Sequence, residues 1–324
     1  MRKKVLITGG AGYVGSATTR HLLSLNYEVF VIDNLLQGSE GVTCFMGYPT
    51  YKFIKGDIND YDLVEELIKK VDYVVHLAAI VGEGACKKEP DLTRKTNIDG
   101  TKKLIDLCSK NKIERFIFFS TCSSYGVQDT NKMANEETQL NPVSLYAESK
   151  ISMEEYLKKN YDPELAFTIL RPSTVHGLAP RMRFDLIVNH LCKDAILYDK
   201  LEIFGGNLWR PLMWVGEVGR IVDIILKSES KLIKNEIFNL GNTNANMKKR
   251  EIAEIIKNKF LPNVNLEYSG EDQDLRSYKV DFTKIETKLN FKLEKSIEEA
   301  IDELLLSLKN KMYSDPENKK YRNH

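Results

Sequence analysis

Residues 3–15 read KKVLITGGAGYVG, and the rest of the chain is organised around this stretch. Its apolar run, residues 5–7, is short enough to predict a buried parallel strand rather than a helix. A helical pattern begins at Tyr13, and three glycines at three-residue spacing stand around its start: Gly9, Gly12 and Gly15. A strand that passes through glycines into a helix directs backbone N–H groups and the positive end of the helix dipole at one place. The stretch therefore predicts a site for a diphosphate.

A carboxylate follows the second predicted strand at the position that selects a dinucleotide. Residues 29–32 (VFVI) predict a buried strand, and Asp33 comes directly after it, about 20 residues beyond the glycines. A carboxylate there hydrogen-bonds a ribose 2′-hydroxyl and repels a 2′-phosphate. The alternative is a glycine turn without a ligand, which the strand–loop–helix–strand context disfavours. Together the two features predict NAD, and not NADP, as the cofactor.

The alternation of strands and helices predicts an α/β fold with a doubly wound parallel (Rossmann) sheet and right-handed crossovers. Further strands are expected at residues 51–55, 72–77, 115–119 and 166–170. A long helix is expected over residues 91–110, and another over residues 141–160, where Asn141 would be the cap and Pro142 would stand in the first turn. Residues 34–50 are expected to be irregular.

Beyond about residue 170 this alternation loosens, which predicts a smaller C-terminal lobe. We expect an NAD-binding domain over residues 1–170 and a substrate-binding lobe over residues 171–312, from which segments can return to the sheet. Residues 313–324 are expected to be a polar, frayed tail. The other elements expected after residue 170 are helices at 216–227, 248–257 and 296–308 and a strand at 236–240. The lobe would cover the carboxyl edge of the sheet, where the far end of a ligand would lie.

Composition excludes several classes of function. The 324 residues carry a formal net charge of +1, which gives no electrostatic basis for binding nucleic acid or an anionic membrane. No stretch approaches the ~20 apolar residues that a membrane helix needs. The five cysteines, which form no CxxC pair, are Cys44, Cys86, Cys108, Cys122 and Cys192. This pattern predicts neither disulfides nor a metal site. We therefore expect a cytoplasmic protein without nucleic-acid or membrane partners.

Tyr146 and Lys150 stand four residues apart in a predicted helix, so both side chains lie on one face. A neighbouring ammonium favours the phenolate of a tyrosine that otherwise titrates near pH 10, and a phenolate can accept the proton of an alcohol that is being oxidised. Thr121 follows the predicted strand 115–119 and would hydrogen-bond the same oxygen. A tyrosine and a lysine at this spacing often belong to a solvent-exposed helix face. The dinucleotide motif elsewhere in the chain favours a catalytic role for this pair. His76 lies inside an apolar strand and is expected to be structural.

The chain resembles an extended short-chain dehydrogenase/reductase of the NAD-dependent nucleotide-sugar epimerase/dehydratase family. The resemblance covers nearly the whole chain, and its motifs stand in the order of the family. They are TGGAGYVG at 8–15, Asp33, GDI at 56–58, HLAA at 76–79, Asn97, STCSSYG at 120–126, YAESK at 146–150, RPSTVHG at 171–177, WRPLMWV at 209–215 and a stretch around Arg276 and Asp281. These motifs are specific for the family and much less specific for the sugar.

The resemblance implies a cofactor site beside a substrate site, with Thr121, Tyr146 and Lys150 as the catalytic residues. The residues implied for NAD are Gly9, Gly12, Tyr13, Val14, Gly15, Asp33, Asn34, Asp57, Ile58, Leu77, Ala78, Ala79, Asn97, Tyr146, Lys150 and Pro172. Those implied for a nucleotide-linked sugar are Val81, Thr121, Ser123, Thr174, His176, Arg181, Asn189, Arg210 and Arg276. Arginine suits a diphosphate because its planar fork donates two hydrogen bonds at once, although Arg181, Arg183 and Arg210 could also be ordinary surface charges.

Three departures from the family pattern bear on the reaction. His176 stands where the family usually has a tyrosine, Trp214 stands where it often has a histidine, and Cys122-Ser123 replaces the Asp-Glu pair of its dehydratases. Neither a thiol nor a serine hydroxyl replaces a carboxylic acid, so we predict that no water is eliminated.

The resemblance implies an oxidoreductase or epimerase that transfers hydride, with oxidation at carbon 4 of the sugar through a keto-sugar. The alternatives are a dehydratase or keto-sugar reductase of the same family and, in a different class, a non-catalytic NAD sensor. Related enzymes pair the helices expected at 91–110 and 141–160 across a two-fold axis. Both helices carry apolar residues on more than one face, so a homodimer is predicted.

Overall fold

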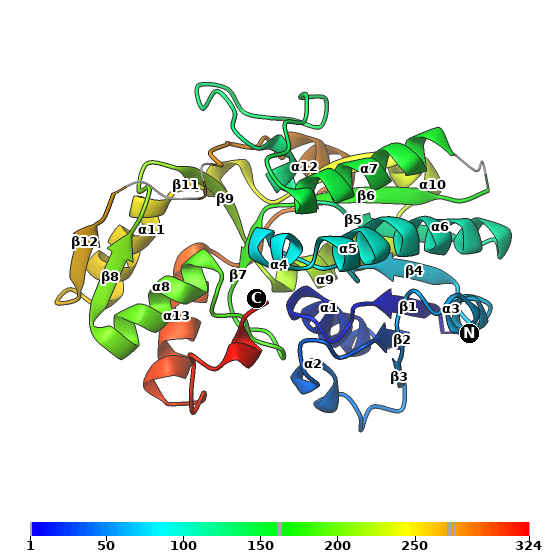
Figure 1. Ribbon diagram of the computed structural model, residues 1–324, viewed down its shortest axis with the longest axis horizontal. Coiled ribbons are helices and arrows are strands. Elements are labelled where there is room, and N and C mark those ends of the chain that lie inside the picture. The colour runs from blue at the N-terminus through cyan, green and yellow to red at the C-terminus, as the bar shows by residue number, and fades with distance from the viewer. Residues whose placement is uncertain (1, 161–163, 271–273, 275, 324) are drawn as a thin grey trace.

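A seven-stranded parallel sheet forms the centre of the larger part of the protein (Figure 1). The computed structural model describes residues 2–160, 164–270, 274 and 276–323. The strand order is β10-β6-β5-β4-β1-β2-β3, and every neighbouring pair is parallel. The strands are β1 (Lys4–Thr8), β2 (Glu28–Asp33), β3 (Tyr51–Lys55), β4 (Tyr73–His76), β5 (Arg115–Phe119), β6 (Phe167–Pro172) and β10 (Glu236–Leu240). The order reverses between β1 and β4, which is where such sheets bind ligands. The predicted doubly wound fold is confirmed.

Helices cover both faces of this sheet, which is why its strands read as continuous apolar runs. In β1, Val5 and Ile7 belong to the core on one face and Leu6 to the core on the other. The helices of the first face are α1 (Tyr13–Ser24) and α9 (Gly216–Lys227), and those of the second are α3 (Tyr61–Ile68), α6 (Thr101–Lys110) and α7 (Leu145–Lys159). Both α9 and β10 come from beyond residue 170, so segments of the C-terminal half complete the sheet and its cover.

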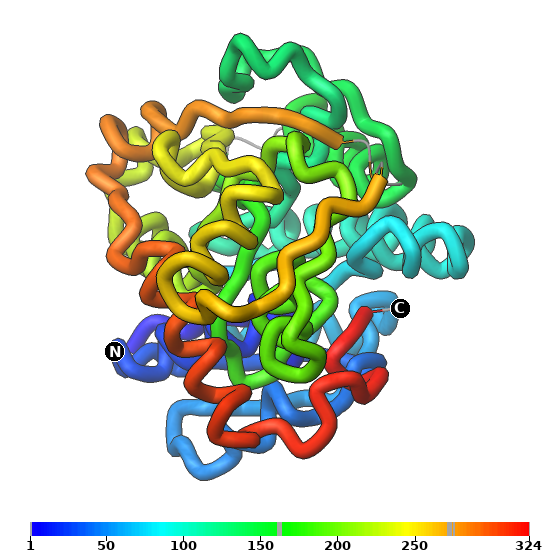
Figure 2. Tube along the Cα trace, turned by 90° about the vertical axis from the view of Figure 1, so that its left-hand side faces the viewer, coloured from blue at the N-terminus to red at the C-terminus, as the bar shows by residue number. Residues whose placement is uncertain are grey.

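The smaller lobe, on the left in Figure 1 and facing the viewer in Figure 2, has its own apolar core. A three-stranded sheet in the order β11-β9-β7 and a two-stranded sheet of β12 and β8 support it. The strands are β7 (Thr174–His176), β8 (Lys200–Ile203), β9 (Trp209–Trp214), β11 (Asn246–Lys248) and β12 (Asn265–Tyr268). The helices are α8 (Ile187–Tyr198), α11 (Lys249–Ile255), the π-helix η4 (Ile256–Phe260) and α13 (Ile297–Lys309).

Several predicted boundaries are wrong. The helix expected from Asn141 begins at Leu145, because the Ser144 hydroxyl caps it by accepting from the Ala147 N–H, while the Asn141 N–H bonds to the Ser124 carbonyl. The helix expected over 91–110 is α5 (Pro90–Arg94), the π-helix η1 (Lys95–Gly100) and α6 in succession. The remaining short elements are α2 (Glu40–Thr43), which lies in the segment expected to be irregular, α4 (Glu83–Lys88), η2 (Cys122–Tyr125), α10 (Ser230–Ile233), η3 (Thr243–Ala245), α12 (Thr283–Leu289) and η5 (Lys319–Tyr321).

The C-terminal segment is not frayed as expected. Tyr313 and Tyr321 pack edge-on against Phe184, with ring centroids 5.0 and 5.4 Å away. The Phe184 N–H also donates to the Tyr321 carbonyl over 2.9 Å. Two tyrosines thus anchor a segment that is otherwise polar. Figures 1 and 2 place the C end of the chain beside the blue N-terminal segments.

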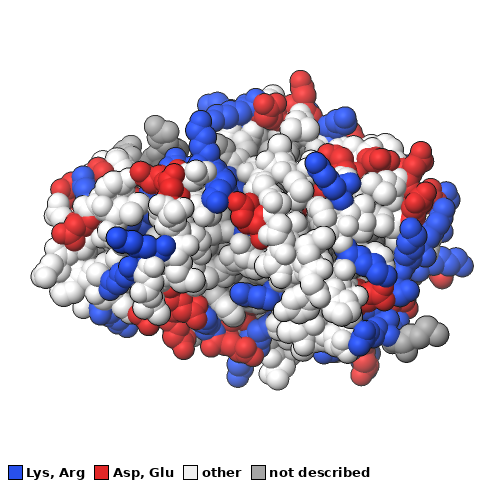
Figure 3. Space-filling view, turned by 90° about the horizontal axis from the view of Figure 1, so that it is seen from below, with Lys and Arg blue, Asp and Glu red and all other residues white. Residues whose placement is uncertain are grey.

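The surface and the helices give two further findings. Within the described ranges, no helix is long and apolar enough to cross a bilayer. On the face shown in Figure 3, acidic and basic side chains are interspersed, with no continuous area of one sign.

The apolar residues of α6 all lie in the core, and the exposed positions of α6 and α7 include Lys103, Asp106, Glu148 and Glu155. The expectation of apolar residues on more than one face is therefore wrong for α6.

Candidate active site

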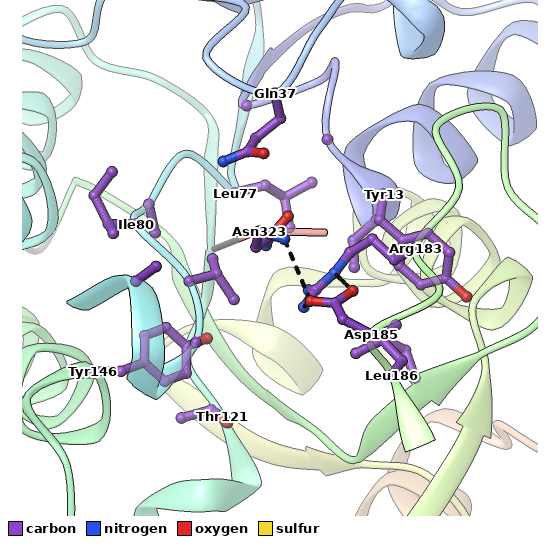
Figure 4. Close-up of a pocket in the computed structure, with 18 of the residues that line it drawn as sticks. Tyr13, Gln37, Leu77, Ile80, Thr121, Tyr146, Arg183, Asp185, Leu186 and Asn323 are labelled. Atoms are coloured by element: carbon purple, nitrogen blue, oxygen red, sulfur yellow. Dashed lines mark hydrogen bonds and ion pairs between the residues drawn. The ribbon is translucent and has the colours of Figure 1, made fainter. Parts of the chain in front are cut away.

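A cavity of about 1510 Å³ runs along the carboxyl ends of the sheet strands and under the smaller lobe. Every residue expected in the site lines it except Asn97, His176 and Asn189. The cavity therefore brings together side chains from the loops after β1, β2, β3, β4, β5 and β6 with others from the lobe. Figure 4 shows part of its wall.

The glycine loop at one end of the cavity packs too closely against neighbouring backbone to admit side chains. Gly9 has φ +73°, and a Cβ there would lie 2.6 Å from the backbone nitrogen of Ala78. A Cβ on Gly15 would collide with the carbonyl oxygen of Gly9. Gly12 is the N-cap of α1 and has no side chain to satisfy the first N–H groups of the helix. This cradle of free N–H groups at a helix N-terminus fits the diphosphate of a dinucleotide.

Polar side chains gather where β2 and β3 end. The carboxylate of Asp33 accepts from the Ala11 N–H over 3.0 Å and from the Leu35 N–H over 2.8 Å. Burial raises the pKa of Asp33, while these two backbone bonds oppose the rise. Asn34 donates to Asp57 over 2.9 Å, and both line the cavity. A carboxylate has about four acceptor positions, so Asp33 keeps capacity for the hydroxyls of a ribose.

The loop after β4 is held by residues beneath it, one of which was expected in the cofactor site. The side-chain oxygen of Asn97 accepts from the Ile80 N–H over 2.8 Å, and its amide donates to the Ile80 carbonyl over 3.0 Å. Asn97 is thereby directed away from the cavity and positions the loop, which corrects its assignment. His76 is fully buried, with Thr8 2.7 Å from its Nδ1 and Thr101 2.9 Å from its Nε2, and burial lowers its pKa well below the usual range. It is structural, as predicted.

Thr121, Tyr146 and Lys150 all line the cavity. Thr121 follows β5, Tyr146 stands in the first turn of α7 and Lys150 one turn later. The hydroxyl of Thr121 lies 2.7 Å from the hydroxyl of Ser123 and close enough to Tyr146 to affect the pKa of that phenol. Figure 4 shows Tyr146 and Thr121 side by side at the cavity. The Nζ of Lys150 lies 4.9 Å from the centroid of the Phe118 ring.

The protonation of this group differs from the expectation. Burial raises the pKa of Tyr146 to about 12, although the positive charges of Arg183 and Arg276 and the hydrogen bond with Thr121 oppose the rise. Burial also lowers the pKa of Lys150 to about 8. We expected Lys150 to lower the pKa of Tyr146, but removal from water dominates both groups. In the free protein Tyr146 is therefore a phenol at neutral pH, and most Lys150 side chains carry a charge.

A buried ion pair fixes the strand end that carries Thr121. Arg171 donates to Glu154 through two nitrogens, over 2.6 and 3.0 Å, and the Ser120 hydroxyl donates to the same carboxylate. The thiol of Cys122 donates to the Arg171 carbonyl over 3.0 Å, and burial raises its pKa above the usual range. Because Glu154 lies on α7, the network ties that helix to the ends of β5 and β6. Cys122 is thus a packing residue and no acid.

A charged cluster lines the lobe side of the cavity. Arg276 donates twice to Asp274, over 2.7 Å each, and Arg210 donates to the same carboxylate over 2.9 Å. Glu83 forms a second ion pair with Arg276 at 3.1 Å. Burial lowers the pKa of Lys249, which also lines the cavity, to about 8. Arg210 and Arg276 were expected here. Their partners were missed, because only the fold brings Glu83, the first residue of α4, close to Arg276.

Three residues assigned to the sugar need correction. His176 is only 2% exposed, and burial lowers its pKa to about 3, so it does not reach the cavity and cannot replace Tyr146 as a base. Asn189 is fully buried, accepts from the Gly177 N–H over 2.9 Å and contacts the Tyr13 hydroxyl at 3.3 Å, so it joins α8 to α1. Arg181 does line the cavity, but it lies close enough to Asp33, which was assigned to the cofactor, to interact with its charge.

Other residues on the wall were not expected from sequence. Arg183 forms a two-point ion pair with Asp185 at 2.9 and 2.6 Å, and Asn323 lies beside this pair in Figure 4. Gln37 lines the wall across from them. Two features of the sequence could have indicated these residues. They are the opposite charges of Arg183 and Asp185, two residues apart, and the tyrosines of the C-terminal segment.

Comparisons with known proteins show the family and the fold of the chain. The sequence model described as "NAD dependent epimerase/dehydratase family" matches residues 5–241. A Methanocaldococcus jannaschii protein described as a putative UDP-glucose 4-epimerase is 31% identical over 260 residues, which are 79% of this chain and 82% of that protein.

Two solved structures superimpose along nearly the whole chain. The UDP-glucose 4-epimerase of Thermotoga maritima, solved with UDP-glucose, has a TM-score of 0.85 and 26% identity, and the match covers 96% of this chain and 100% of that one. The UDP-glucuronic acid 4-epimerase of Bacillus cereus, in complex with UDP-glucuronic acid and NAD, has a TM-score of 0.84, 25% identity and the same coverage.

Proposed function

The chain belongs to the NAD-dependent epimerase/dehydratase family, and we propose that it is a 4-epimerase of a nucleotide-linked sugar. The observation that carries this proposal is that Thr121 and Tyr146 lie side by side on the wall of the same cavity as the glycine loop (Figure 4). A non-catalytic NAD sensor would have no use for these two hydroxyls and Lys150 at one place.

The proposed chemistry moves one proton and one hydride at carbon 4. NAD, when bound, supplies the acceptor for the hydride and can return it to either face of the keto-sugar. Tyr146 takes the proton of the 4-hydroxyl and gives it back, while Thr121 orients that oxygen. Because the pKa of Tyr146 is about 12 in the free protein, its ionisation depends on positive charge that the bound complex adds around it.

The charged cluster supports a nucleoside diphosphate as the carrier of the sugar. Arg210 and Arg276 present planar guanidinium groups to the cavity, and such forks bind phosphate oxygens in pairs. Asp274 and Glu83 hold these arginines by ion pairs in the free protein. The relatives named above act on UDP-linked sugars, and we propose a UDP-hexose as the substrate class.

Residues 122 and 123 support epimerisation over dehydration. An elimination needs an acid for the leaving oxygen and a base for the neighbouring proton. Cys122 is buried under the site, and Ser123 bonds to Thr121, so neither supplies a carboxylic acid at this position. The oxidation needs only the groups already described, and every oxygen of the sugar should remain in the product.

Product analysis on a panel of sugars tests the function. The purified protein with NAD would be incubated with UDP-glucose, UDP-galactose, UDP-glucuronic acid and UDP-N-acetylglucosamine, and the products followed by proton NMR. We expect interconversion of 4-epimers for at least one pair. A product that is oxidised, reduced or dehydrated at equilibrium, without its 4-epimer, would contradict the proposal.

We also propose a two-fold homodimer through the exposed faces of α6 and α7. These faces carry charges of both signs, including Lys103 on α6 and Glu148 and Glu155 on α7. Opposite charges on the two helices would pair across the axis, since each copy offers both faces.

A further inference from the structure

Residues 318–323, hereafter the strap, lie across the end of the cavity that holds Asp33. Asn323 lines the cavity, and its N–H donates to Asp185 over 3.3 Å. In Figure 4 it stands in the middle of the view, among Gln37, Leu77 and Arg183. Lys320, on the outer side, forms an ion pair with Glu40 at 3.3 Å. The strap thus touches both the loop after β2 and the loop after β7.

Arg181 links the strap to the cofactor end. It is only 2% exposed, and its guanidinium donates to the Asn323 side-chain oxygen over 2.8 Å and to the Arg322 carbonyl over 2.9 Å. The guanidinium also donates to the Gln37 side-chain oxygen over 3.2 Å, and the backbone N–H of Arg181 donates to the Ser16 hydroxyl on α1 over 3.2 Å. One buried arginine therefore connects the loop after β2, the first turns of α1, the loop after β7 and the strap.

These contacts lie beside Asp33, at the cofactor end of the cavity. Gln37 belongs to the loop that follows Asp33, and Arg181 is near enough to Asp33 to lower its pKa by its charge. A dinucleotide seated on Asp33 and the glycine loop would lie beneath Asn323 and Arg181. The strap is held by polar contacts and by one ring, Tyr321, so it can open without disturbing the sheet.

We propose that the strap is part of the cofactor site and keeps NAD bound between turnovers by closing over it and fixing Arg181. An enzyme that returns its hydride to the substrate needs no exchange of cofactor, and a strap of this kind suits such a cycle. The inference goes beyond the proposed sugar chemistry, since it concerns only the release of the cofactor.

Release of NADH from the full-length protein tests the strap directly. The protein would be loaded with NADH, mixed with a large excess of NAD, and the loss of bound NADH fluorescence followed in time. We expect Asn323→Ala and Tyr321→Ala to release NADH about tenfold faster than the wild type, since each removes a contact that holds the strap closed. Lys319→Ala is the matched control, because this exposed residue lies in the strap without touching the cavity, and its release rate should equal that of the wild type.

Hydrogen exchange by mass spectrometry adds a readout that needs no turnover. Bound NAD should slow exchange at residues 318–323 in the wild type and do so less in Asn323→Ala. If Tyr321→Ala fails to fold, as judged by circular dichroism, Asn323→Ala decides alone. Release from Asn323→Ala within twofold of the wild type, or no protection of the strap by NAD, would overturn the inference. Either result would leave the epimerase assignment standing, because the NMR assay does not depend on the rate of release.

Discussion

At the scale of single residues, burial sets the chemistry of the site. The pKa of Tyr146 lies at about 12 and that of Lys150 at about 8, so the free protein holds a neutral phenol beside a destabilised ammonium. Removal from water disfavours the charged form of each group. Burial therefore opposes the ionised form of both groups in the free protein. Ligand binding has to lower the pKa of Tyr146 before this residue can accept a proton.

Tyr146→Phe isolates the ionisable oxygen. The ring remains, so the fold and NAD binding should be kept, while kcat falls by about 10²- to 10⁴-fold because the proton has no acceptor. Tyr156→Phe on the same helix is the control, since that hydroxyl donates to Asp106 over 2.7 Å, does not line the cavity and should not affect turnover. Retention of wild-type kcat in Tyr146→Phe would show that another group moves the proton.

Lys150→Met should stabilise the protein at neutral pH while abolishing activity. Below pH 8 the lysine is charged in both the folded and the unfolded state, and its burial costs about 3 kcal/mol for a pKa lowered from 10.5 to about 8. Between pH 8 and 10.5 the unfolded wild type binds more protons than the folded wild type. The free energy of unfolding of the wild type should therefore rise relative to that of the variant as pH rises through this range. Urea unfolding at pH 7 and pH 10 measures both values, with the exposed Lys158→Met as control. If Lys150→Met is less stable than the wild type at pH 7, burial of the charged lysine does not destabilise the protein, and the prediction is wrong.

Sequence identifies residues whose roles follow from their place on a strand end or a helix face. Gly9, Asp33, Tyr146 and Lys150 were found in this way, and each lines the cavity. The error at Asn97 has a different origin, because only packing decides whether a side chain turns to the ligand or to a neighbouring backbone. The same applies to His176 and Asn189.

At the scale of elements, one buried ion pair orients the two segments that carry the catalytic group. Arg171 is on β6 and Glu154 on α7, and the Ser120 hydroxyl joins their pair directly before Thr121. A buried pair adds little net stability when intact, but loss of one partner leaves an uncompensated charge. The pair should therefore matter for both stability and the alignment of Thr121 with Tyr146.

Glu154→Gln should lower the free energy of unfolding by about 3 kcal/mol, because Arg171 then keeps a buried charge without its partner. Denaturant unfolding gives the value. Glu66→Gln on α3 is the control, since this carboxylate is exposed and lies outside the proposed dimer interface, and its effect should be within about 0.5 kcal/mol. A loss below 1 kcal/mol for Glu154→Gln would contradict this role of the pair.

Apolar runs predicted the sheet strands well, because a strand buried on both faces leaves a continuous signal. The helices at 216–227 and 296–308 were also predicted nearly to their ends. The strand β7 was missed because it has only three residues and follows Pro172 closely. The strand β9 was missed because it contains Pro211, and a proline in the sequence favours a loop. Ser144 caps α7 in competition with Asn141, and tertiary contacts decide between them.

At the scale of the whole molecule, the assembly should depend on salt. The faces of α6 and α7 proposed to pair are charged, so their attraction is screened as ionic strength rises. We expect light scattering at micromolar protein to give the mass of a dimer at 0.05 M salt and a decreasing average mass toward 1 M. A monomer at low salt would contradict the proposed interface.

The position of the C-terminal segment also belongs to this scale and could not be predicted. Its partners, Phe184 and Arg181, lie more than a hundred residues earlier in the chain. Composition alone describes residues 313–324 as polar, whereas the contacts of two tyrosines decide where the segment lies. One residue of this segment, Asn323, consequently lines the cavity, although the segment was expected to be a frayed tail.

The central claim is that carbon 4 of the sugar is oxidised and then receives the same hydride again. The most direct test uses whichever nucleotide sugar of the panel is turned over, prepared with deuterium at carbon 4, and analyses the product by mass spectrometry and NMR. The account predicts the 4-epimer with unchanged mass and with deuterium still at carbon 4. A product lighter by one water, or an epimer that has lost its deuterium, would contradict it.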